Sequence, residues 1–168
     1  MQDSNPYSAP AAAVADIAPA GTQELAGRGM RLLAVIIDTV ILMVILIPMM
    51  VASGYFTGMM SGARPALGTQ LMWGAFSIVL FVLVQGYPLS QSAQTWGKKL
   101  LKMKIVHLDG SQPSLGVLLG KRYVPVQVAG QVPFIGWLLS LVDVLFIFGQ
   151  ERRCIHDLIA GTRVVVAD

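Results

Sequence analysis

The chain has 168 residues, of which 55% are hydrophobic and only 12% are charged. A soluble domain typically carries about 25% charged residues, so this composition and a mean hydropathy of +0.67 exclude an ordinary soluble protein. They indicate an integral membrane protein. The net charge of +3 comes from basic residues outside the apolar runs, where it determines topology. We therefore expect a lipid bilayer as partner and no nucleic acid.

The N-terminal segment, residues 1–25, is rich in Ala and Pro and shows no apolar periodicity. A segment of this composition cannot bury a core, so we expect it to be a flexible tail. It lacks a basic region followed by an apolar region, and it is therefore not a cleavable signal peptide. Residues 26–168 are expected to form one transmembrane domain.

The first apolar run, residues 32–52, contains one charged residue, Asp38. About 20 apolar residues suffice to cross a bilayer as a helix, so this run predicts a transmembrane span. An ionisable group near the middle of a span costs at least roughly 2.5 kcal/mol to insert and usually faces a protein interior. A second run, residues 71–89, has no charge at all and predicts a second span.

Loop charges predict the topology. The segment 90–121 carries five lysines against Asp109 alone, and Arg28 and Arg31 precede the first span. Because basic loops remain in the cytoplasm, the N-terminus and this loop are expected inside, and residues 53–70 outside.

The last apolar segment, residues 115–148, is interrupted by Pro125 and Pro133. One long span would carry the C-terminal arginines outside, against the charge rule. Two short arms turning around residues 131–136 would return the C-terminus to the cytoplasm, and we favour this helical hairpin.

Two short β-prone runs support that topology. Residues 102–108 (KMKIVHL) and 162–166 (TRVVV) are rich in β-branched residues and bounded by turn formers. Each needs a hydrogen-bonding partner, and the simplest partner is the other run. The expected fold is an all-α membrane protein of three to four transmembrane or re-entrant helices. A small two-stranded β-pair lies at its cytoplasmic face, and both termini are cytoplasmic.

A buried charge network is expected inside the membrane. Arg31 and Asp38 are seven residues apart on one helix face, about 10.5 Å along the axis, and cannot pair directly. Arg122 (or Lys121) is the best-placed partner for Asp38. Three interpretations stay open: a buried pair that fixes packing, a titrating proton or cation site, and exposure to an aqueous vestibule. Asp143, in the last apolar run, is expected to border the same interior.

The cluster Cys154, His156 and Asp157 resembles a metal or catalytic site at first sight. Zinc needs three or four ligands, and His107 is distant in sequence. A Cys–His nucleophile pair two residues apart has poor mutual geometry. We therefore expect no metal, no cofactor and no catalytic site.

Four segments together resemble the RDD family of small bacterial membrane proteins. They are GRGMRLLAVIID (27–38), QTWGKKLLKMKIVHLDG (94–110), VPFIGWLLSLVDVLFIF (132–148) and RRCIHDLIAGTRVV (152–165). The resemblance implies that Arg31 is the family arginine and Asp38 its first aspartate. For the second aspartate, Asp157 fits the terminal H-D-x-x-A-G-T signature and Asp143 fits an acidic position in the preceding span. The implied signature residues are Arg31, Asp38, His156, Asp157, Gly161 and Thr162.

Two functional hypotheses follow. The first is a non-catalytic interaction, assembly or accessory module, held together by the charge network of Arg31, Asp38, Arg122 and Asp143. The alternative is cation/proton antiport using Asp38 and Asp143, as the resemblance allows. The chain is short for this role, because three or four helices without an internal repeat rarely build a transport path alone. Expected partners are anionic lipids at the cytoplasmic face and another membrane protein or a second copy of the chain. The expected location is the bacterial inner membrane, in multi-pass topology.

Overall fold

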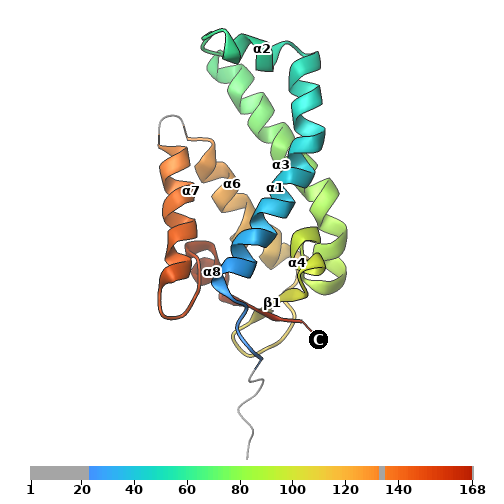
Figure 1. The fold of residues 1–168 in the computed structure, drawn as a ribbon, viewed down its shortest axis with the longest axis vertical. Helices are drawn as coiled ribbons and strands as arrows, with labels where there is room; N and C mark the ends of the chain where they lie inside the picture. Colours follow the sequence, from blue (N-terminus) through green and yellow to red (C-terminus); the bar gives the residue numbers. More distant parts are fainter. Residues whose placement is uncertain (1–22, 133–134, 168) are drawn as a thin grey trace, which may run out of the picture.

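The computed structural model describes residues 23–132 and 135–167. The predicted tail up to residue 22, and Pro133 in the predicted turn, lie outside the described residues. These described residues are mostly helical, with one small sheet at one end (Figure 1). In chain order the elements are α1 (Arg28–Ala52), α2 (Tyr55–Met60), α3 (Leu67–Ser92), α4 (Trp96–Leu100), β1 (Met103–His107), α5 (Leu115–Val117), η1 (Leu118–Tyr123), α6 (Val124–Gly130), α7 (Gly136–Leu145), η2 (Phe146–Phe148), α8 (Ile155–Ala160) and β2 (Thr162–Val166).

The two long helices, α1 and α3, are long and apolar enough to cross a membrane. They contain the two predicted spans, whose apolar helical character is confirmed. Most side chains of α1 and many of α3 are exposed. Val44 of α1 and Leu83 of α3 keep 68% and 73% of their surface accessible. Apolar surface of this extent marks a membrane or partner interface, because water would be an unfavourable solvent for it. The short helix α2 connects the two at one end (Figure 1).

The last apolar segment forms two arms, in keeping with the hairpin prediction. The first arm is α5, the π-helical turn η1 and α6, and the second is α7 with η2. The arms lie side by side (Figure 1). A Cβ at Gly136 would lie only 2.3 Å from the carbonyl oxygen of Gly130. Glycine is therefore required where the two backbones meet.

The predicted β-pair is confirmed. β1 and β2 are antiparallel, with Met103 opposite Val166 and His107 opposite Thr162. Leu25, at the end of the predicted tail, forms a bridge to Val165, so the segment before α1 lies along the sheet edge. The paired strands supply the hydrogen bonds that either strand alone would lack.

The buried apolar core lies beside this sheet, where Leu89, Ile105, Leu118 and Val164 have 1% exposure or less. We call residues 25–38, 85–123 and 143–166 the base, because they include the sheet, α4, η1, α8 and the first turns of α1. We call residues 39–84 the distal region. The polar site described below lies in the base.

Candidate functional site

A buried ion triad ties three segments of the base together. Asp157 of α8 is completely buried and forms ion pairs with Arg31 of α1 and Arg122 of η1, which are themselves at most 6% exposed. Burial alone would raise the pKa of Asp157. The Arg122 guanidinium, helped by that of Arg31, instead holds that pKa well below the ordinary range of an aspartate. The carboxylate is therefore ionised, and it neutralises charge from two distant parts of the chain.

Local structure around α8 explains the terminal signature. Cys154 is the N-cap residue of α8, and its backbone N–H donates to Asp157 Oδ2 over 3.1 Å. Gly161 ends the helix at φ 63°, a left-handed conformation that favours glycine. Thr162 Oγ1 then accepts a hydrogen bond of 2.6 Å from Arg122 Nη1. The signature residues thus shape one helix and position one carboxylate.

Asp38 is held by a second, separate set of donors. Its Oδ1 accepts hydrogen bonds from Gln85 Nε2 (3.0 Å) and from the Gly97 backbone N–H (2.8 Å). Its Oδ2 accepts from Thr95 Oγ1 (2.5 Å). Thr95 also caps α4, and a Cβ at Gly97 would lie 2.3 Å from the Ala34 carbonyl oxygen. Asp38 therefore fastens the start of α4 to α1.

The expected pairing of Asp38 with Arg122 is wrong, because Arg122 pairs with Asp157. Side chains on a helix lean toward its N-terminus, so Arg31 at the start of α1 reaches down to α8. Asp38, two turns further along, meets α4. Within residues 23–132 and 135–167, Asp38 makes no hydrogen bond or ion pair with Arg31, Arg122 or Asp143. The sequence predicted a single charge network, whereas the structure has two separate clusters, one around Asp38 and one around Asp157.

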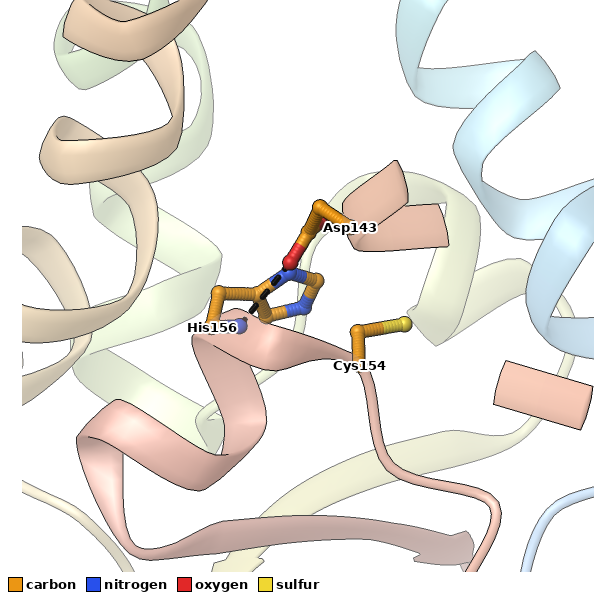
Figure 2. A group of neighbouring side chains, drawn as sticks. All are labelled: Asp143, Cys154 and His156. Carbon is orange, nitrogen blue, oxygen red and sulfur yellow. Dashed lines mark hydrogen bonds and ion pairs between the residues drawn. The ribbon is translucent and has the colours of Figure 1, made fainter. Parts of the chain in front are cut away.

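Asp143 of α7 belongs to the α8 cluster through His156. Its Oδ1 accepts from the His156 backbone N–H at 2.9 Å, and its Oδ2 lies 2.7 Å from Nδ1 (Figure 2). Burial lowers the pKa of His156, even though the bond to Asp143 would raise it. The neutral imidazole then donates from Nδ1. Its Nε2 lies 3.7 Å from Asp157 Oδ1, so the two aspartates share one histidine.

One group could hold a metal ion by the chemistry of its side chains. Ligand atoms of Asp143, Cys154 and His156 all lie within 4.8 Å of one another (Figure 2). Both Asp143 oxygens, however, already accept from His156. Burial raises the pKa of the Cys154 thiol to about 11, and Arg31 Nη2 lies 3.7 Å from its sulfur. A metal needs the thiolate and would have to displace these bonds, so the geometry fits a hydrogen-bonded cluster better.

Sequence reasoning missed three residues of the site, namely Gln85, Thr95 and Gly97. Two signals were present in the sequence. Gln85 is a polar side chain in an otherwise apolar span, and Thr95 stands at a helix start, where a hydroxyl caps free N–H groups. The sequence gives no sign that Asp143 lies beside Cys154 and His156, because α7 and α8 bring it there only in the folded chain.

Comparisons with known proteins show which family the chain is similar to. The sequence profile of the RDD family matches residues 25–161. The chain is 32% identical over 144 residues to "Uncharacterized protein YckC" of Bacillus subtilis (strain 168), covering 84% of this chain and 85% of that protein. It is 36% identical over 89 residues to "Uncharacterized protein YxaI" of the same organism, covering 52% and 54% of the two chains. No solved structure matches the chain.

Proposed function

Since the chain belongs to the RDD family and carries two long apolar helices, we propose that it is a non-catalytic assembly or accessory module of the bacterial inner membrane. In this proposal the base and both chain ends are cytoplasmic, and α1 and α3 cross the bilayer. The exposed apolar faces contact lipid and another membrane protein or a second copy of the chain. The basic residues of the base attract anionic lipids.

One observation carries the proposal: every carboxylate of the buried clusters is occupied by donors from within the chain. Asp38 accepts three hydrogen bonds, Asp143 accepts two from one histidine, and Asp157 pairs with two arginines. A transport carboxylate has to exchange its ligands during turnover. Carboxylates that fasten helices together in this way support a structural role.

Antiport through Asp38 and Asp143 is the second candidate, and the same geometry weighs against it. Asp38 would have to release Gln85, Thr95 and Gly97, which would free α4 from α1. Asp38 and Asp143 are also held by different partners. A shared ion path between them would need a rearrangement of the base.

Flux measurements in proteoliposomes separate the two candidates. The purified chain is reconstituted with a trapped pH-sensitive dye, and Na⁺ or K⁺ is added outside. We expect proton flux equal to that of empty liposomes. Cation-dependent flux that is abolished by Asp38→Asn, while the variant keeps its folded yield, would overturn the proposal in favour of antiport.

The assembly role is tested by the mass of the purified particle in lipid nanodiscs. We expect a protein mass above the 18.0 kDa of one chain, from a second copy or a co-purifying membrane protein. A protein mass of one chain, with no accompanying protein, would contradict the assembly role.

A further inference from the structure

A partly enclosed cavity of about 290 Å³ lies in the base between α1 and the end of α7. Its lining combines apolar side chains with basic ones, and no carboxylate residue among the described residues lines it. The basic side chains are those of Arg28, Arg31, Lys98 and Arg122.

Lys98 is the most unusual of these groups. Its side chain belongs to a residue that is only 6% exposed. Its ammonium lies 3.4 Å from the Tyr123 hydroxyl and 5.9 Å from the centre of that ring. In the part of the chain that the structure describes, no carboxylate lies within 4.0 Å of it. A buried charge normally has a counter-ion, because leaving water without one is costly.

The neighbouring arginines leave the cavity with an excess of positive charge. Arg31 and Arg122 share Asp157 as counter-ion. Arg122 is 1% exposed, and its Nε has no hydrogen-bond partner among the described residues. Four basic side chains line the cavity, and the carboxylates of the neighbouring clusters, Asp38, Asp143 and Asp157, are fewer even when all three are counted. The cavity therefore favours an anion.

The mouth of the cavity has the opposite character. Leu32 and Val35 of α1 and Phe148 of η2 line it and are exposed by 45%, 44% and 63%. In the proposed membrane placement these side chains face lipid. A ligand that fits both parts has an anionic group inside and an apolar chain outside.

We propose that this cavity holds the phosphate of an anionic phospholipid, with Lys98 as its counter-ion and the acyl chains leaving past Val35 and Phe148. Phosphate oxygens accept several charge-assisted hydrogen bonds at once, which suits the free donors of Lys98 and Arg122. The inference rests on the proposed membrane placement and does not depend on the assembly role.

Thermal unfolding of the full chain in a neutral detergent tests the proposal. The probes are dioctanoyl phosphatidylglycerol, dioctanoyl phosphatidylcholine and inorganic phosphate at equal concentrations. We expect the phosphatidylglycerol to raise Tm most. Lys98→Gln should weaken its binding about tenfold or more, because a charged hydrogen bond is lost. Lys99→Gln is the matched control: it removes the same charge one residue away, from an exposed ammonium that lies over the Trp96 ring.

A second pair of variants keeps all charges and tests the apolar mouth. Val35→Trp should obstruct the exit and abolish the response to phosphatidylglycerol. Val40→Trp, on an exposed part of the same helix, should leave it unchanged. An equal response to inorganic phosphate would show a free-anion site and overturn the lipid assignment. The lipid proposal would be overturned if the unaltered chain gave no response, or if the response were unchanged in both Lys98→Gln and Val35→Trp. The assembly role would not be affected by that result, because the particle mass tests it independently.

Discussion

The base and the distal region share the helices α1 and α3 but are held together by different forces. In α1 the buried residues are Arg31, Ala34 and Asp38, all in the base. Beyond them the helix exposes apolar side chains such as Val44. In the distal region the ring contacts are Tyr55 with Trp73, with centroids 5.4 Å apart, and Trp73 with Phe76, at 5.7 Å. Directional polar contacts thus fasten the base, whereas the distal region presents aromatic contacts and exposed apolar side chains.

This difference predicts where substitutions will matter. A polar network in a low-dielectric interior stabilises strongly when every member is satisfied, and it is costly when one member is lost. Exposed apolar side chains, in contrast, have no single partner to lose. Substitutions in the base should therefore dominate, and those that remove a shared counter-ion should have the largest effect.

Asp157→Asn should have the largest effect. It leaves Arg31 and Arg122 buried without a counter-ion, and breaking a buried pair typically costs about 3–5 kcal/mol. We expect little folded protein, measured as monodisperse yield after extraction in mild detergent. Yield near that of the unaltered chain would contradict the central place of the triad.

Glu151→Gln is the matched control for that prediction. Glu151 is 71% exposed and forms an ion pair of 3.0 Å with Arg153. Exposed pairs of this kind contribute less than about 1 kcal/mol. The two substitutions make the same chemical change, so a difference in yield isolates the effect of burial.

Gly97→Ala should come next. Its Cβ would lie 2.3 Å from the Ala34 carbonyl oxygen, and backbone cannot move away as a side-chain tip can. Forced overpacking typically costs about 1–3 kcal/mol, and here it also disturbs the Asp38 bonds. Gly120→Ala, where a Cβ meets nothing within 4 Å, is the control. Tm in detergent should fall for the first variant only; an equal Tm in both would contradict close contact of α4 with α1.

Much of the fold could be predicted because its signals are local. The apolar runs predicted α1 and α3, and β-branched residues between turn formers predicted β1 and β2. The partners of the charged residues could not be predicted. Arg122 lies 35 residues before Asp157. The direction of its side chain depends on the π-helical turn η1, for which the sequence has no recognisable pattern. For Asp38 the sequence predicted a charged partner, whereas in the structure its carboxylate accepts hydrogen bonds from an amide, a hydroxyl and a backbone N–H.

Asp38→Asn should have a smaller effect than Asp157→Asn, because Asp38 has neutral donors. An asparagine Oδ1 keeps the bonds from Gln85 and Gly97, and the Thr95 hydroxyl can rotate to accept from the new amide. We expect a loss of about 1–3 kcal/mol if one group stays unsatisfied. Adding Arg122→Gln should lower stability further, since Arg122 serves Asp157. If the double variant instead recovered its Tm, the result would support the predicted Asp38–Arg122 ion pair and contradict the structure.

The smallest effect we predict is a change in pH dependence at His156. Burial lowers its pKa, so the folded chain favours the neutral imidazole, whereas in the unfolded chain the pKa is about 6.5. Its contribution to stability is thus full above pH 6.5 and is lost as the pH falls below that value. The Asp157 contribution, from a lowered pKa, is lost only below about pH 4. His156→Asn keeps a donor near the Nδ1 position but cannot titrate. It should therefore flatten the fall of Tm between pH 7 and pH 5, and an unchanged slope would show that His156 does not link protonation to unfolding of the base.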